Sequence, residues 1–323
     1  MNRRTIFKLA FAAAAASGIA TVQAQDFPAK PIEIVLPLTA GGLTDASMRI
    51  LAERLTGILG QQVLVVNKPG AAGTIAARYV AQSRPDGYTL LAVTSSHTSV
   101  VPYAQPEAGL QPLRDFTPVG TITRSPSVLY VNPKVPASTL AGFIEYAKAH
   151  PGDLTYGTAG MGSFGHVASE LLFKGAGIDL EMVPYQGGSK FTTALVAGEI
   201  DAVFTLPSGT LGQYVAQGKL KALGVSLPEP SPELPGVPTI ATTLPGFEAV
   251  VWTGLLAPAD TDPAVVETLN QAIAKVLDQP DVRKQYAEMG IQAAAMTPGE
   301  YEAVITREQQ RWKPLIEELG LAH

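Results

Sequence analysis

Short apolar runs alternate along the chain with stretches in which apolar residues recur every three or four positions. The first unit places an apolar run at 34–36, a turn with two glycines at 39–45, and apolar residues at helical spacing from Met48 to Leu59. This order predicts a strand, a glycine turn and a helix. Because the alternation repeats, we predict a mainly parallel sheet, in which ligands bind at the carboxyl ends of the strands.

The same alternation predicts two α/β halves with proline-rich connections. Further strands are expected at 63–66, 88–93, 128–131, 154–156, 180–184, 200–205, 221–225 and 250–256, with helices after most of them, including one at 140–149. The segments 102–118 and 227–245 predict irregular connections, and the strand at 250–256 is expected to return to the first half. Thr297 and Glu300 form a capping-box pattern before a last helix, which Pro314 is expected to kink or end early.

The amino-terminal segment has the pattern of an export signal. Basic residues precede an apolar run at 9–16, and a small-x-small motif ends at Ala24. We interpret residues 1–24 as a signal peptide cleaved after Ala24, because the apolar run is too short to span a bilayer comfortably. The pair Arg3 and Arg4 leaves both the general and the twin-arginine export routes open.

Composition narrows the classes of function. Removing the signal takes away three positive charges and changes the formal net charge from −5 to −8, which argues against nucleic acids and anionic membranes as partners. The chain has no cysteine, which excludes disulfides, thiolate metal sites and a catalytic thiol. The four histidines show no metal-binding spacing, so we predict no metal site. No later segment approaches a membrane span, so the mature protein is expected to be soluble in an exported compartment.

The turn at 39–45 offers a site for a carboxylate. Gly41 and Gly42 let main-chain N–H groups converge, and the first turn of the following helix adds unpaired donors and the positive end of its dipole. The alternative interpretation is a tight strand-to-helix connection with Thr44 or Asp45 as the N-cap.

A second glycine loop is open to more than one interpretation. Residues 160–165 match G-x-G-x-x-G between a strand and a helix, and acidic residues follow about twenty positions later, as in dinucleotide sites. The N–H donors of the same loop serve a carboxylate equally well. Ser163 lacks the glycine two positions before it that a nucleophile elbow requires, which argues against a serine hydrolase. Ser95, Ser96 and His97 belong to a predicted loop at 94–99 after another strand and are weaker candidates at the same edge.

Sequence segments spread over nearly the whole mature chain resemble one family. They are 27–32, 40–45, 67–73, 85–90, 156–166, 184–188, 198–201, 252–258 and the helix that contains Trp312. Together and in this order they resemble the Bug (TctC) family of periplasmic solute-binding proteins, which serve tripartite tricarboxylate transporters.

The resemblance implies an α/β, two-lobed type II periplasmic binding protein, or Venus flytrap, with two interlobe crossings. It implies lobe 1 at 25–122 plus 226–323 and lobe 2 at 123–225. It also implies a monomer with no enzyme activity and no cofactor, whose partners are a small organic acid and the membrane subunits of the transporter.

The resemblance also implies the ligand-binding residues. They are Gly41, Gly42, Thr44 and Asp45 in the first lobe and Thr158, Gly160, Gly162, Ser163 and His166 in the second, with Tyr185 and Asp201 close by. The pairs Leu38-Thr39 and Lys190-Phe191 depart from the usual family pattern in the part of the pocket expected to contact the body of the ligand.

These observations lead to a hypothesis with two rivals. We expect a periplasmic receptor that captures a small mono- or dicarboxylate in an interlobe cleft for delivery to a tripartite tricarboxylate transporter. One rival is an NAD-dependent oxidoreductase that uses the Gly160 loop, and the other is a ligand sensor that contacts a membrane kinase.

Overall fold

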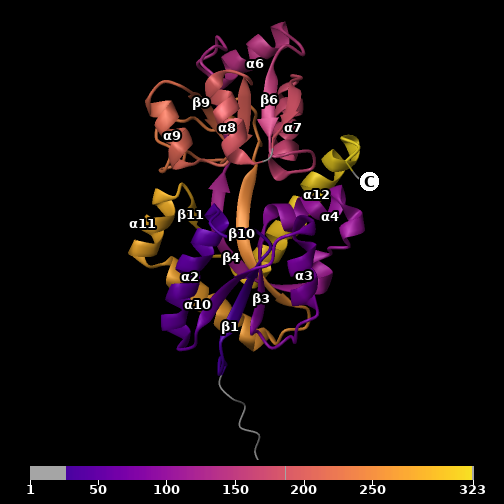
Figure 1. Cartoon of the computed structure of the whole chain (residues 1–323), viewed down its shortest axis with the longest axis vertical. Helices are drawn as coiled ribbons and strands as arrows, with labels where there is room; N and C mark the ends of the chain where they lie inside the picture. Colours follow the sequence, from indigo (N-terminus) through magenta and orange to yellow (C-terminus); the bar gives the residue numbers. More distant parts are fainter. Residues whose placement is uncertain (1–26, 186, 322–323) are drawn as a thin grey trace, which may run out of the picture.

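The computed structural model describes residues 27–185 and 187–321, which form two α/β lobes stacked along the long axis of the molecule (Figure 1). The predicted signal peptide at 1–24 and its cleavage site lie outside the described residues. Each lobe is built around its own sheet, as the predicted alternation of strands and helices requires.

The first lobe contains a six-stranded mixed sheet in the order β11-β4-β10-β3-β1-β2. The strands are β1 (Ile32–Leu36), β2 (Val63–Asn67), β3 (Thr89–Thr94), β4 (Phe116–Pro126), β10 (Val250–Pro258) and β11 (Gln292–Ala293). The strands β1, β2 and β3 are parallel, whereas β10 runs antiparallel to both β3 and β4. The mainly parallel prediction therefore holds for only half of this sheet, because β10 enters it from the opposite lobe.

Amphipathic helices cover this sheet. The longer ones are α2 (Leu43–Leu59), α3 (Thr74–Ala81), α10 (Pro263–Leu277), α11 (Pro280–Glu288) and α12 (Pro298–Glu318). Helix α2 buries Met48, Leu51 and Leu55 against β1, β3 and α10, which is the helical face that the sequence pattern predicts.

The second lobe contains a five-stranded sheet in the order β7-β6-β8-β5-β9. Its strands are β5 (Val128–Val131), β6 (Thr155–Thr158), β7 (Glu181–Pro184), β8 (Ala202–Thr205) and β9 (Lys221–Val225), and its helices are α6 (Leu140–Ala149), α7 (Phe164–Ala176), α8 (Gly188–Ala197) and α9 (Gly209–Ala216). Its core contains the buried rings of Phe143, Tyr156 and Phe173.

Two chain crossings join the lobes, and the side chain of Ser226 hydrogen-bonds to both crossings. The first crossing leads from β4 through Ser127 into β5, and the second leads from the segment after β9 into β10. The buried hydroxyl of Ser226 accepts a hydrogen bond from the Ser127 amide at 2.8 Å and donates one to the Ala249 carbonyl at 2.6 Å. The two crossings are therefore hydrogen-bonded to each other at the hinge.

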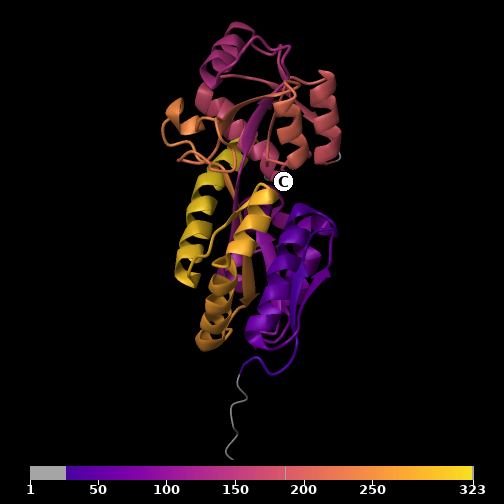
Figure 2. The same ribbon diagram turned by 90° about the vertical axis from the view of Figure 1, so that its left-hand side faces the viewer.

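Two segments after residue 225 pack against the second lobe, although the resemblance implies that residues 226–323 belong to the first. Ile240 and Phe247, in the connection before β10, join the core of the second lobe. The last turns of α12 contribute Trp312 and Ile316 to the same core, and Figure 2 shows this helix running from one lobe to the other.

Three local predictions were wrong in whole or in part. The stretch 94–99, expected to be a loop, begins a helical segment made of η2 (Ser96–Val100) and α4 (Val101–Ala104), because buried residues such as Val100 and Val101 pin it between the lobes. The segment 102–118 contains the short helices η3 (Pro106–Ala108) and α5 (Pro112–Asp115). Pro314 does not end α12 early, since the helix continues to Glu318 with Leu315 and Ile316 packed on its inner face.

Candidate functional site

A cavity of about 440 Å³ lies where the two lobes meet. The first lobe and its crossing strands contribute Leu38, Leu43, Thr44, Ser47, Thr94, Ser96, Thr123, Ser125, Ser127, Val251, Thr253 and Ile291, and the second contributes Gly157, Thr158, Ala159, Ser163, Phe164, Gly165, Gly188, Phe191, Phe204, Thr205 and Leu206. This volume suits a small organic molecule.

Among the described residues, the cavity wall carries hydroxyl and apolar groups and no charged side chain. An anion in the cavity would therefore be held by main-chain N–H groups, hydroxyls and helix ends. Such donors are found at helix starts in both lobes: at the start of α2 in the first lobe, and at the starts of α7 and α8 in the second, where α8 begins at the lining residue Gly188.

The first helix start belongs to α2. Its N-cap, Gly42, has no side-chain cap, so side chains leave the amides of the first turn open. Leu43 and Thr44, in that first turn, line the cavity. The hydroxyl of Ser47 is already used, because it donates to the Thr44 carbonyl at 2.9 Å.

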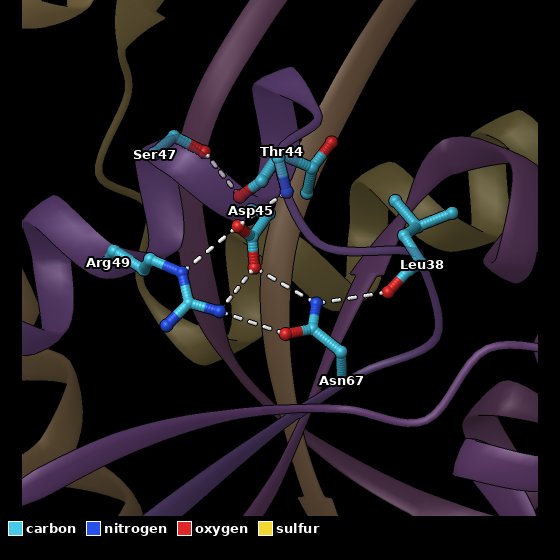
Figure 3. A network of polar contacts seen from close by, with 7 residues as sticks. Leu38, Thr44, Asp45, Ser47, Arg49 and Asn67 are labelled. Atoms are coloured by element: carbon cyan, nitrogen blue, oxygen red, sulfur yellow. Dashed lines mark hydrogen bonds and ion pairs between the residues drawn. The ribbon is translucent and has the colours of Figure 1, made fainter.

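Asp45 holds the glycine turn in place (Figure 3). Its carboxylate accepts hydrogen bonds from the Gly41 amide at 3.0 Å, from the Arg49 guanidinium at 2.9 and 3.0 Å, and from the Asn67 amide at 2.9 Å. The Arg49 guanidinium is the main reason that the pKa of Asp45 falls to about 2, with the Gly41 amide and Asn67 adding to it against the effect of burial. Asn67 also donates to the carbonyl of Leu38 at 3.0 Å, which fixes the chain on the other side of the turn.

This network changes the role of two predicted ligand residues. The carboxylate of Asp45 and the amide of Gly41 are committed to each other, and neither residue lines the cavity. They shape the turn that presents Leu43 and Thr44, and we assign them a positioning role.

The second helix start belongs to α7. Its N-cap, Ser163, accepts a hydrogen bond from the His166 amide at 3.2 Å and shares one with the Thr158 hydroxyl at 3.0 Å. The Gly162 amide donates to Nδ1 of His166 at 3.1 Å. Phe164 and Gly165 follow the N-cap and line the cavity, so their amides are the ones placed to meet an anion.

The glycines of this loop allow its backbone conformation. Gly160 and Gly162 have φ angles of 117° and 71°, in the left-handed region that favours glycine. Neither residue lines the cavity, and the Gly162 amide is already bonded. Burial lowers the pKa of His166, so its neutral ring accepts from Gly162 and holds the loop.

Of the three candidates after β3, Ser95, Ser96 and His97, only Ser96 lines the cavity. The Ser95 hydroxyl accepts a hydrogen bond from the Trp252 amide at 2.8 Å and is buried. The buried ring of His97 lies against Gly73, and its Nδ1 is 3.0 Å from the Thr94 hydroxyl. Burial lowers the pKa of His97 to about 4, so this ring is neutral at physiological pH.

Two further candidates lie away from the cavity. Asp201 accepts hydrogen bonds from the amide and hydroxyl of Thr155 and pairs with Lys134, at the start of β6, about 10 Å from the cavity end of that strand. The side chain of Tyr185 lies in a separate depression beside α8. Asp201 and Tyr185 therefore support the strands of the second lobe and do not line the cavity.

Sequence reasoning missed the residues of the two crossing strands. Thr123, Ser125 and Ser127 come from β4 and its end, and Thr253 comes from β10. The sequence does contain a pattern that indicates this polar face: hydroxyl residues alternate with other residues from Thr121 to Ser127, as on one face of a strand. The two departures noted at Leu38 and Phe191 do line the cavity.

The described residues give no sign of a metal site or a membrane helix. No group of three or more His, Cys, Asp or Glu side chains that could hold a metal ion occurs among residues 27–185 and 187–321. Within the same ranges no helix is long and apolar enough to cross a bilayer.

Two α/β lobes that enclose a cavity at their crossing strands define the periplasmic binding protein class. An R. palustris protein solved with adipate matches with a TM-score of 0.79 and 31% identity, over 92% of this chain and 99% of that chain. MatC from Rhodopseudomonas palustris, with bound malate, matches with a TM-score of 0.74 and 32% identity, over 90% and 100%. The two-lobed fold predicted from the sequence is confirmed.

The family follows from the sequence match. The model of the tripartite tricarboxylate transporter family receptor, TctC, matches residues 47–321. Protein BugT of Bordetella pertussis is 34% identical over 309 residues, which cover 95% of this chain and 94% of BugT. The chain belongs to the TctC family of solute-binding receptors, and the predicted resemblance is confirmed.

Proposed function

We propose that this protein captures a small carboxylate between its lobes in the periplasm and delivers it to the membrane subunits of a tripartite tricarboxylate transporter. One observation carries the proposal: the first turns of α2 and α7, from opposite lobes, open onto the same cavity, whose described lining residues carry no charge. The adipate and malate bound by the two structural relatives support an acid as the ligand.

The geometry also gives the mechanism of capture. An acid that touches the amides near Leu43 and those near Phe164 contacts both lobes, and it makes both contacts only when the lobes are together. Such a ligand has a higher affinity for the closed state and shifts the population towards it. The membrane subunits then recognise the closed conformation.

A hydrolase is a poor fit to this site. The hydroxyl of Ser163 contacts Thr158 and caps α7, while Nδ1 of His166 accepts from the Gly162 amide. Neither bond pairs Ser163 with the imidazole as a general base, which a nucleophilic serine needs. We therefore assign these residues to loop structure and anion binding.

Calorimetric titration of the purified protein with mono- and dicarboxylates, and separately with NAD, tests the proposal. We expect at least one acid to bind and NAD to give no heat. A Gly165→Val variant places a branched side chain at the start of α7 and is expected to weaken acid binding. Gly175→Ala, on the same helix with open space around it, is the matched control. Binding of NAD without binding of any acid contradicts the proposal.

A further inference from the structure

The floor of the cavity carries hydroxyl groups that the protein itself does not use. Thr123 and Ser125 from β4 and Thr253 from β10 line the cavity, although each residue is no more than 5% exposed. Within the described part of the chain none of these hydroxyls has a hydrogen-bond partner. Every side-chain oxygen that is fully enclosed in this part of the chain has a hydrogen-bond partner. The three unpaired hydroxyl oxygens are therefore not fully enclosed, and they are accessible from the cavity.

The strand register brings the hydroxyls together. Thr123 lies directly opposite Thr253 in the antiparallel pair, and Ser125 lies opposite Val251. Side chains two positions apart share a face of a strand, so Thr123, Ser125 and Thr253 point to the same side. Residues directly opposite each other have Cβ atoms about 5 Å apart, which lets the two threonine hydroxyls reach a single ligand oxygen.

Buried hydroxyls of this kind discriminate between ligands. In the absence of ligand, water satisfies them, and a ligand that displaces this water must supply a hydrogen-bonding atom in its place. A methylene group cannot do so and leaves the hydroxyls unpaired, whereas a ligand hydroxyl or carbonyl restores the bonds. A site built in this way rejects the analogue that lacks the oxygen.

We propose that Thr123, Ser125 and Thr253 form a specificity-determining subsite for an oxygen substituent on the body of the bound acid. Hydroxy acids and oxo acids then bind in preference to unsubstituted acids of the same length. This inference rests on the proposed function, since it presupposes that the cavity holds a carboxylate.

The subsite differs in role from the two helix starts. Both of its strands belong to the sheet of the first lobe, so its geometry does not depend on the position of the second lobe. Contacts that are equal in the open and closed states shift no population. The floor therefore sets selectivity, while the starts of α2 and α7 set closure.

Isothermal titration with matched acid pairs tests the subsite, with succinate against malate and adipate against 3-hydroxyadipate as probes. We expect the hydroxylated member of at least one pair to bind about 10-fold more tightly. Thr253→Val keeps the shape and removes the hydroxyl, so it is expected to weaken that hydroxy acid about 10-fold and to leave the unsubstituted acid within about 2-fold. Thr253→Ser, which keeps the hydroxyl, is expected to retain the preference.

The outcomes separate the two proposals. Equal affinities within both pairs, or an equal loss for both acids in Thr253→Val, overturn the subsite and leave the carboxylate receptor intact. Failure of all four probes and of the wider acid panel overturns both. A melting curve of each variant confirms that the comparison is made between folded proteins.

Discussion

The ring of Phe164 lies edge-on against the indole of Trp312, with centroids 5.6 Å apart and ring planes at 70°. Phe164 is the first residue of α7 and lines the cavity, whereas Trp312 lies in the C-terminal helix α12. Tyr301, near the start of α12, packs against the crossing strand β10 at Gly254. One helix therefore connects the sheet of the first lobe to the cavity-facing start of α7 in the second.

A buried carboxyl group lies in the same helix and gives a pH-dependent prediction. Glu308 is 4% exposed and accepts a hydrogen bond from the Trp312 indole at 2.7 Å. Burial raises the pKa of Glu308 above its usual value, despite the opposing effects of Trp312 and Arg311. The folded protein thus holds this proton more tightly than the unfolded chain, so the stabilisation is complete at low pH and is lost as pH rises through the raised pKa.

We therefore expect Glu308→Gln to increase the free energy of unfolding at pH 8, because the neutral amide avoids the cost of a buried charge and still accepts from Trp312. The gain is expected to vanish near pH 4, where the wild-type carboxyl is also protonated. Urea unfolding at both pH values measures the difference. Glu317→Gln, an exposed position of the same helix, is the control. A gain independent of pH would contradict the assignment.

Asp45 predicts the opposite pH dependence. Its pKa of about 2 lies below the usual 3.8, so its contribution is present above the unfolded pKa and is lost as pH falls towards 2. We expect Asp45→Asn to cost about 1–2 kcal/mol at pH 7, a value discounted because Arg49 is half exposed. The difference in the free energy of unfolding between variant and wild type is expected to disappear between pH 4 and 2. Urea unfolding measures it.

Asp281→Asn, which removes an exposed ion pair with Arg54, is the control for Asp45 and is expected to change stability by less than about 0.5 kcal/mol. Because Asp45 shapes the turn that presents Leu43 and Thr44, acid binding is also expected to weaken in Asp45→Asn. An unchanged affinity would show that the turn keeps its shape without the carboxylate.

Periodicity was enough to predict much of the fold. The helix Leu140–Ala149 and the strand Lys221–Val225 have the bounds that the apolar pattern gives, because both bury apolar side chains in the core. The capping box of Thr297 and Glu300 forms as its local spacing predicts. The mixed first sheet could not be predicted in the same way, since the position of β10 depends on a chain that returns from the other lobe.

The site was predicted less well, for a physical reason. Glycine turns are local signals, and both predicted turns do lead into helix starts at the cavity. Which amides stay open depends on tertiary partners, such as Asn67 for Asp45, 22 residues away. The floor at Thr123 and Thr253 depends on strand register between distant segments, so no local pattern pairs them.

The hinge serine is expected to matter for stability. Ser226→Ala leaves the Ser127 amide and the Ala249 carbonyl without the hydroxyl that bonds both, in a fully buried position. We expect a loss of about 1–3 kcal/mol in the free energy of unfolding. Thr268→Ala, which removes a hydroxyl bonded within the surface of α10, is expected to cost much less. Chemical unfolding compares them, and equal losses would contradict a special role for Ser226.

Phe191 sets the size of the cavity on the side of the second lobe. Its side chain is 6% exposed and occupies the space beside Gly157 and Gly188, where added Cβ atoms would lie 3.0 and 3.4 Å from it. We expect Phe191→Ala to cost about 3 kcal/mol in stability and to enlarge the cavity, because the ring is lost from its wall.

The added space changes which acids fit. In Phe191→Ala the ratio of adipate to succinate affinity is expected to rise, since the longer chain fills part of the volume that the ring vacates. Titration of both acids measures this ratio. Phe247→Ala removes a ring of the same size from the core of the second lobe and outside the cavity wall, so it is the matched control for lost stability. An equal shift of the ratio in both variants would assign the effect to general loosening and not to Phe191.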